Sequence, residues 1–132
     1  MQSIIKLSEA TAIALHAMIY IAKKSPNSSR VSEIATEFSI SENHLSKVLQ
    51  RLVKAGYLIS TKGPKGGFVI TEEKNNTTFM DVYKVIEGDM PFTTCLFNKS
   101  ACKPKPCIMG GLISKINNEF VDYFTNTKIS DF

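Results

Sequence analysis

The feature that most constrains the fold is a pair of short amphipathic segments followed at once by a basic, glycine-rich turn. The first segment covers 31–38, with Ser32 as its expected cap, and the second opens at Ser41 and runs to about residue 55. Only the turn at Ser39–Ile40 separates them, and two short helices joined so tightly form a helix-turn-helix. The pattern therefore predicts a mainly helical protein built around this motif.

The basic turn that follows is expected to form a β-hairpin. The β-rich runs 57–60 and 68–70 flank the sequence Thr-Lys-Gly-Pro-Lys-Gly-Gly, and such runs around a glycine-rich tip are typical of a hairpin. Glycines let a backbone approach a phosphate group closely. We therefore expect Lys62, Lys65 and Gly66 to contact DNA. The predicted fold class is mainly α with a small β wing, a winged helix-turn-helix.

Three more helices complete the predicted fold. The first is capped by Ser8 and runs to about residue 24, another covers 78–87 and ends at Gly88, and the last covers 108–125. The first helix is expected to turn one face to the core, formed by Ala12, Leu15, Ile19 and Ala22.

The last helix carries an apolar residue at every fourth position, and we expect it to join two copies of the chain. These residues are Ile108, Leu112, Ile116, Phe120 and Phe124. We divide the chain into a winged helix-turn-helix domain at 1–88, a cysteine-bearing cluster loop at 89–107, and a dimerisation helix and tail at 108–132, all in one structural unit.

The helix that opens at Ser41 has an outward face suited to reading bases. In a winged helix this second helix of the motif lies in the major groove. Asn and Gln can pair with adenine, Lys and Arg with guanine, and Ser with either. An ordinary solvated face has a similar composition, so the expectation depends on the wing beside it. The expected DNA contacts from the two helices are Ser32, Ser41, Asn43, His44, Ser46, Lys47 and Arg51, with Gln50 on the same face.

The composition agrees with a nucleic-acid partner. Sixteen Lys and Arg against twelve Asp and Glu give a net charge of +4, which favours polyanions. No stretch has the pattern of a signal peptide or of a bilayer span, so we expect a cytoplasmic protein with no membrane partner. The sequence has no phosphate-binding loop, nucleophile elbow or Cys-His pair within one motif, so we expect no enzyme.

The three cysteines lie close together, at Cys95, Cys102 and Cys107, with the spacing C-x6-C-x4-C. Thiolates are the ligands that zinc and iron–sulfur clusters prefer. Three thiolates do not complete a tetrahedral zinc site, and no Cys-x2-Cys pair is present. We expect an iron–sulfur cluster with a fourth ligand from elsewhere, for which His16 is a candidate. Direct thiol sensing without a metal stays open.

With these motifs together, the chain resembles the Rrf-type (Rrf two) winged-helix transcriptional regulators, in particular the iron–sulfur and nitric-oxide sensors similar to IscR and NsrR. The resemblance implies a homodimer that binds palindromic promoter sites on double-stranded DNA, and a 2Fe–2S or 4Fe–4S cluster held by the three cysteines. It also implies a redox- or nitric-oxide-sensitive repressor whose Lys62 enters the minor groove. The matching segments are Lys6-Leu7-Ser8, Ala14-Leu15, Ser32-Glu33-Ile34-Ala35, Ile40-Ser41, Leu45-Ser46-Lys47-Val48-Leu49 with Leu52, and Gly63-Pro64-Lys65-Gly66-Gly67-Phe68.

The sequence departs from the family pattern around the cluster. The middle cysteine is displaced by one residue, and Gly110 stands where IscR-like members carry a histidine ligand. Ala12 stands where some nitric-oxide sensors carry an acidic ligand, whereas His16 matches a first-helix histidine of a redox-switching member. The resemblance therefore leaves the cluster type and the fourth ligand open.

Overall fold

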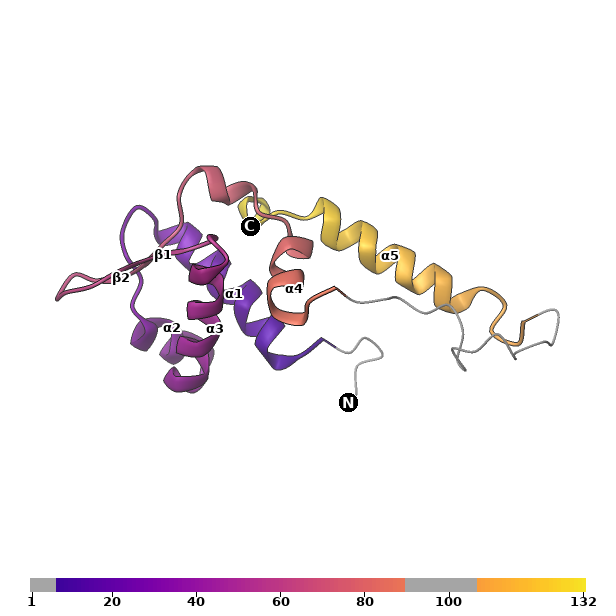
Figure 1. Ribbon diagram of the computed structural model, residues 1–132, viewed down its shortest axis with the longest axis horizontal. Coiled ribbons are helices and arrows are strands. Elements are labelled where there is room, and N and C mark those ends of the chain that lie inside the picture. The colour runs from indigo at the N-terminus through magenta and orange to yellow at the C-terminus, as the bar shows by residue number, and fades with distance from the viewer. Residues whose placement is uncertain (1–6, 90–106) are drawn as a thin grey trace.

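The computed structural model describes residues 7–89 and 107–132. Within these ranges the chain forms five α-helices, one two-stranded antiparallel sheet and two short 3-10 helices, so the predicted winged helix-turn-helix is confirmed (Figure 1). The elements in chain order are α1 (Glu9–Lys24), α2 (Val31–Phe38), α3 (Glu42–Lys54), β1 (Ile59–Thr61), β2 (Gly67–Val69), η1 (Glu73–Asn76), α4 (Phe79–Glu87), α5 (Leu112–Asn126) and η2 (Ile129–Asp131).

Helix α1 is the central helix of the core. Ser8 caps it as predicted, accepting a hydrogen bond from the Thr11 backbone N–H at 3.1 Å. The helix packs against α3, α4, β2 and η2, so its buried surface extends around more than one face. The predicted core face is therefore only partly right, and its residues Ile19 and Ala22 are half-buried against the core. Of its four residues only Leu15 is buried, whereas Met18 and Ile21 are fully buried.

The helix-turn-helix is formed by α2 and α3, and the turn between them passes through Ser39 in the left-handed conformation. The expected cap at Ser32 is wrong, because α2 begins one residue earlier and Arg30 occupies the cap position without a side-chain bond. The preceding residue, Ser29, is held in a backbone bridge with Phe68, which brings the chain to α2 in an extended conformation.

Helix α3 begins where the sequence predicts. Ser41 caps it by accepting a hydrogen bond from the His44 backbone N–H at 3.3 Å. Its inward face is apolar and completely packed, which fixes the opposite face toward solvent. The buried side chains are Leu45, Val48, Leu49 and Leu52.

The wing is a short hairpin in which Ile59 pairs with Val69 and Thr61 with Gly67. Gly67 allows the loop after α1 to approach, because a Cβ atom there would lie 2.5 Å from the Ser29 carbonyl oxygen. The Ser28 hydroxyl also donates to the Lys65 carbonyl at 2.8 Å. The loop between α1 and α2 therefore supports the hairpin along one edge.

Helix α4 has a complete capping box, in which Thr78 and Asp81 each accept a hydrogen bond from the other residue's backbone N–H. As predicted, the helix ends at Gly88, which has a φ of 77°.

Helix α5 begins at Leu112 rather than at 108 as predicted. Gly110 and Gly111 both have positive φ angles, so the backbone between Cys107 and α5 forms a turn before the helix begins. Phe124 is buried against Phe79, with 5.7 Å between the ring centroids.

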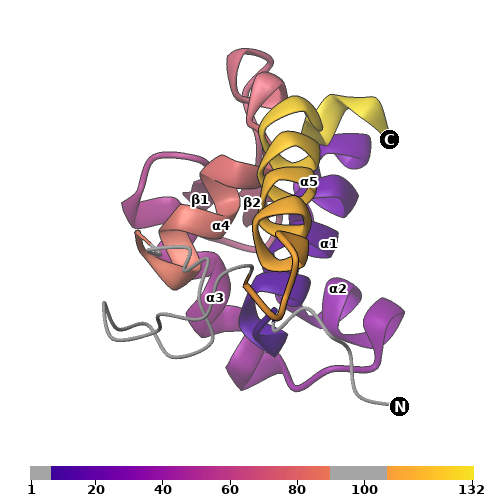
Figure 2. The same ribbon diagram turned by 90° about the vertical axis from the view of Figure 1, so that its right-hand side faces the viewer.

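The chain after α5 returns to the start of α4. The Phe79 N–H donates to the Thr127 carbonyl and the Ile129 N–H donates to the Thr77 carbonyl, both at 2.9 Å. Figure 1 shows the wing at one end of the long axis and α5 reaching toward the other, with α1, α3 and α4 between them; Figure 2 views the same arrangement along α5. No helix in the described ranges combines the length and apolar character needed to cross a bilayer.

Candidate functional site

The outer face of α3 carries most of the side chains that the sequence assigns to DNA. Asn43, Lys47 and Gln50 are exposed, and Ser46 is half-buried beside them. His44 is also half-buried at the start of the helix. Beyond His44 the same face forms a shallow hollow of about 320 Å³, lined by Asn43, Ser46, Lys47, Gln50, Arg51 and Lys54. The helix thus presents amide, hydroxyl and cationic groups together, which are the groups that read base edges.

Sequence reasoning did not select Lys54 for this face, although the signal was present. Lys54 lies four residues after Gln50 and seven after Lys47, and these spacings place side chains on one side of a helix. Ser32, by contrast, lies in the first turn of α2, where it is exposed. Its backbone carbonyl accepts a hydrogen bond from the Thr36 hydroxyl at 2.9 Å.

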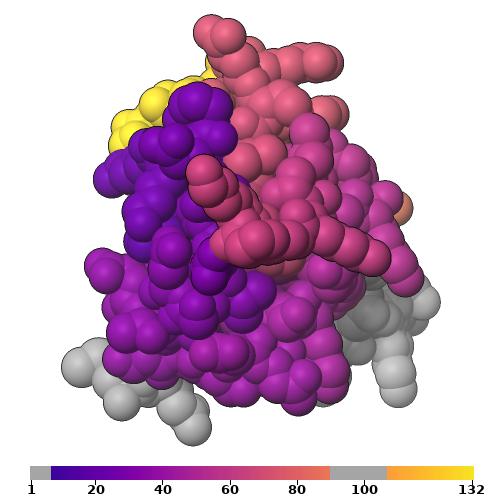
Figure 3. All heavy atoms as spheres, turned by 90° about the vertical axis from the view of Figure 1, so that its left-hand side faces the viewer, coloured from indigo at the N-terminus to yellow at the C-terminus, as the bar shows by residue number. Residues whose placement is uncertain are grey.

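The wing adds two exposed cations to the same end of the molecule. Lys62 and Lys65 are exposed at the hairpin tip. Figure 3 shows the hairpin on one face of the molecule, with α2 and α3 below it on the same face. Gly66 is buried, and its N–H donates to the Gly63 carbonyl at 2.9 Å. A Cβ atom on Gly66 would lie 2.5 Å from the Thr61 carbonyl oxygen. Its position gives Gly66 a role in closing the turn.

Within the described ranges, the lysines on this face form no salt bridge. Across residues 7–89 and 107–132 the salt bridge present joins Lys24 to Glu33 at 3.2 Å, on α1 and α2. Lys47, Lys62 and Lys65 take part in none within those ranges. Unpaired cations on one surface attract a polyanion, and phosphate oxygens would complete their hydrogen bonds.

Arg51 differs from its neighbours on α3. Its guanidinium Nη2 donates to the carbonyl oxygens of Val85 at 3.1 Å and Ile86 at 2.8 Å, at the end of α4. Sequence reasoning assigned this residue to DNA, and the structure gives it intramolecular partners that no local pattern indicates.

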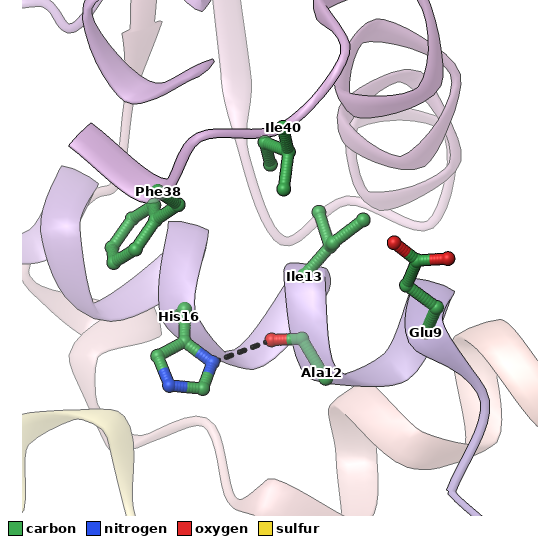
Figure 4. Close-up of a pocket in the computed structure, with 6 residues that line it drawn as sticks. All are labelled: Glu9, Ala12, Ile13, His16, Phe38 and Ile40. Atoms are coloured by element: carbon green, nitrogen blue, oxygen red, sulfur yellow. Dashed lines mark hydrogen bonds between the residues drawn. The ribbon is translucent and has the colours of Figure 1, made fainter. Parts of the chain in front are cut away.

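His16 lines a second hollow, of about 290 Å³, between α1 and the turn of the helix-turn-helix (Figure 4). Its Nδ1 lies 2.7 Å from the Ala12 carbonyl oxygen, and its ring meets Phe38 edge to face at 5.6 Å. Because a carbonyl oxygen only accepts, Nδ1 is the donor in this contact, and Nε2 takes no part in it. Glu9 lines the other end of the hollow, and in Figure 4 its carboxylate does not point toward the imidazole.

Of the three predicted thiolate ligands, Cys95 and Cys102 lie outside the described residues. Cys107 is exposed and forms no disulfide, and it stands immediately before the turn that leads into α5. Within the described ranges no three His, Cys, Asp or Glu side chains come together as a metal site. The donor types nevertheless fit an iron–sulfur cluster, since an accessible thiol and an imidazole with a free Nε2 are both iron ligands.

Glu87, at the end of α4, makes contacts that sequence reasoning missed. Its Oε1 accepts hydrogen bonds from the Ser8 N–H at 3.2 Å and the Thr11 hydroxyl at 2.6 Å. Hydrogen bonding to the side chains of Ser8 and Thr11, with smaller contributions from the Ser8 backbone and the charge of Arg51, lowers the pKa of the Glu87 carboxyl. Its partners are far away in the sequence, so no motif could have revealed it.

Comparison with known proteins agrees with this geometry. Residues 7–132 match the model of the Rrf2 family, described as an iron-dependent transcriptional regulator. An HTH-type transcriptional regulator of Aquifex aeolicus is 30% identical over 94% of this chain and 88% of its own length. The regulator NsrR of Bacillus subtilis is 31% identical over 89% of this chain and 81% of its own length.

A solved structure is similar over nearly the whole chain. The structure of CymR, the global cysteine regulator of B. subtilis, superposes with a TM-score of 0.78 at 26% identity, covering 97% of this chain and 95% of that one. The relatives are regulators and none of these is an enzyme. The chain belongs to the Rrf2 family of transcriptional regulators.

Proposed function

We propose that two copies of this chain bind a palindromic promoter site, with α3 in the major groove and the wing tip at the backbone or in the minor groove. The observation that carries the proposal is the shared face, on which the polar side of α3 and the unpaired Lys62 and Lys65 lie at one end of the molecule. Small polar groups can read base edges, while the lysines neutralise phosphates.

Charge reversal in the wing tests this assignment. Lys62→Glu should weaken binding to a selected promoter fragment by more than tenfold at physiological salt, since it replaces an attraction to phosphate with a repulsion. Lys115→Glu makes the same charge change on an exposed residue of α5 and should leave more of the affinity intact. Equal affinity of Lys62→Glu and the unmodified chain would contradict contact through the wing, and would favour a protein partner for this fold.

The dimer contact is assigned to α5. Leu112 is 49% exposed and Tyr123 is 56% exposed, and Ile116 lies half-buried between them. Apolar side chains along one helix favour burial against a second protein surface, and a two-fold axis would pair the same helix of each copy. Two recognition helices held in this way would reach half-sites about 34 Å apart.

For the sensor we propose an iron–sulfur cluster on Cys95, Cys102 and Cys107, with His16 of the same or the partner copy as candidate fourth ligand. The family description as iron-dependent, the accessible Cys107 and the free Nε2 of His16 support it. When bound, the cluster would supply a centre that reacts with oxidants and nitric oxide. Change at the cysteines would alter the spacing of the two recognition helices and so lower DNA affinity.

Anaerobic purification tests the cluster directly. The visible absorption spectrum should show a brown protein with stoichiometric iron and sulfide, and Cys102→Ala should bleach it. Ser100→Ala, in the same segment, is the matched control and should keep the colour. Colourless, iron-free protein after anaerobic reconstitution with ferrous iron and sulfide would contradict the cluster.

The alternative sensor is the cysteine thiol itself. It is supported by the exposed, unpaired Cys107 and by the similarity to CymR, a global cysteine regulator. Reversible oxidation of a thiol to a sulfenic acid or a disulfide would then replace cluster chemistry. Colourless protein whose DNA affinity falls with peroxide and recovers with a thiol reductant would favour this alternative.

A further inference from the structure

The end of α4 is capped by the recognition helix. Arg51 of α3 donates to the carbonyl oxygens of Val85 and Ile86, which belong to the last turn of α4 and have no partner within that helix. The guanidinium also lies at the negative end of the helix dipole, where a cation is favourable. Arg51 therefore joins the two helices by charge-assisted hydrogen bonds.

The same end of α4 is also attached to the start of α1. The Glu87 carboxylate accepts hydrogen bonds from the backbone of Ser8 and from the side chain of Thr11. Both contacts join residues more than seventy positions apart in the sequence. The start of α1, the second half of α3 and the end of α4 thus meet at one junction.

The junction is adjacent to both functional regions. On the α3 side, Arg51 follows Gln50 and lies one helical turn after Lys47, so a shift of its backbone moves the face assigned to DNA. On the α4 side, the chain turns away at Gly88, and the segment that carries Cys95 and Cys102 follows directly.

We propose that Arg51 is a positioning residue that couples the end of α4 to the recognition helix, so that DNA binding at α3 and chemical change at the cysteines influence each other through this junction. The cysteine part of this inference rests on the proposed function, whereas the coupling between α3 and α4 does not. A bidentate contact of both terminal guanidinium nitrogens with guanine would require Nη2 to leave α4.

Reciprocity gives a test that does not depend on the sensor. If Arg51, bonded to the end of α4, holds α3 in the position that binds DNA, then DNA binding should in turn stabilise the end of α4. Amide hydrogen exchange of the full chain is measured over residues 84–89, with and without a saturating duplex selected by the protein from a random library. We expect about fivefold or greater slowing by DNA in the unmodified chain and less than twofold in Arg51→Met.

The matched control is Lys54→Met, which removes a cation from the same face but no bond to α4. It should require more DNA for saturation and keep the full slowing at 84–89. If Arg51→Met does not fold, as judged by circular dichroism, Arg51→Lys serves instead, since it keeps the charge but not the paired geometry. Slowing in the Arg51 variant equal to that of the unmodified chain would overturn the proposal.

A second arm separates this inference from the proposed sensor. DNA affinity is compared between metal-free chain and chain reconstituted with ferrous iron and sulfide. The ratio of these two affinities should differ from one in the unmodified chain if the reconstituted centre affects DNA binding. If the ratio returns toward one in Arg51→Met, the result supports coupling through the junction. A ratio preserved in Arg51→Met, with affinity lowered equally in both forms, would instead make Arg51 a direct DNA contact. A ratio of one in the unmodified chain would contradict the proposed sensor, while the exchange result would still decide the coupling.

Discussion

Helices α3 and α5 are both amphipathic, but within a single copy of the chain they leave different kinds of side chain exposed. Helix α3 buries its apolar side completely, with Leu45, Leu49 and Leu52 fully buried, and exposes amide and cationic groups. Helix α5 buries only Phe124, and Leu112 and Tyr123 are among its exposed residues. A polar uncovered face suits a nucleic acid, whereas exposed apolar side chains such as Leu112 and Tyr123, which lie among polar ones on α5, suit a second protein surface.

The largest expected effect comes from placing a charge on the uncovered face of α5. Leu112→Asp should convert the proposed dimer to a monomer, because a buried, unpaired carboxylate costs several kcal/mol at an apolar interface. DNA affinity should fall by about 100-fold or more, since the avidity of two linked half-site contacts is lost. Sedimentation velocity and DNA titration measure the two effects.

Asn118→Asp introduces the same carboxylate on α5 at an exposed polar residue and serves as the control. It should remain dimeric and bind DNA with little change. A dimeric Leu112→Asp chain would show that another surface joins the two copies, and would remove the contrast between α5 and α3.

The next effect contrasts the two faces of α3 itself. Leu49 is fully buried, so Leu49→Ala should lower the free energy of unfolding by about 2–5 kcal/mol. Lys47→Ala should leave that free energy within about 0.5 kcal/mol while weakening DNA binding and reducing its salt dependence by about one charge. Urea denaturation and DNA titration at several salt concentrations check both; substantial destabilisation by Lys47→Ala would mean that the outer face also supports the fold.

A smaller effect is expected at the cap of α3. Ser41→Ala removes the acceptor for the His44 N–H and should cost about 1 kcal/mol of stability. Ser46→Ala makes the same substitution in the helix at a hydroxyl with no hydrogen bond among the described residues, and should cost less. If thermal unfolding shows the same loss of stability for Ser41→Ala and Ser46→Ala, the Ser41 cap does not stabilise the helix.

The smallest effect concerns pH. The pKa of Glu87 is lowered in the folded chain from its ordinary value of 4.5, so its carboxylate adds stability above about pH 4.5. That contribution disappears as the pH falls through the folded-state pKa. Glu87→Gln should therefore reduce stability at neutral pH by less than about 1 kcal/mol and flatten the acid side of the stability curve. If the stabilities of the unmodified chain and of Glu87→Gln fall equally steeply as the pH is lowered, the stabilising role of the ionised Glu87 carboxylate is contradicted.

The parts of the fold that depend on local chemistry could be predicted from the sequence. Ser8, Ser41 and Gly88 mark helix ends through hydrogen bonds and backbone angles that involve only neighbouring residues, and the structure confirms each. The start of α5 also had a local signal, the consecutive Gly110 and Gly111, which apolar periodicity alone overlooked.

The parts that depend on distant segments could not be predicted. The buried side of α1 is set by the elements packed around it, and α2 begins before Ser32 because Ser29 is paired with Phe68. Likewise, the partners of Arg51 at the end of α4 are more than thirty residues away. A single sequence does not indicate such contacts, although the predicted helices do contain Arg51, Val85 and Ile86.

The backbone hydrogen bonds between Thr77–Phe79 and Thr127–Ile129 affect which parts of the sequence can change without loss of the fold. They join the end of the last helix to the start of α4, and every residue that forms them lies outside the interval between Asp89 and Cys107. Two fragments divided within that interval should therefore reassemble. Evolution could lengthen, shorten or rewrite the interval and exchange one sensory chemistry for another, while the framework that carries α3 stays the same.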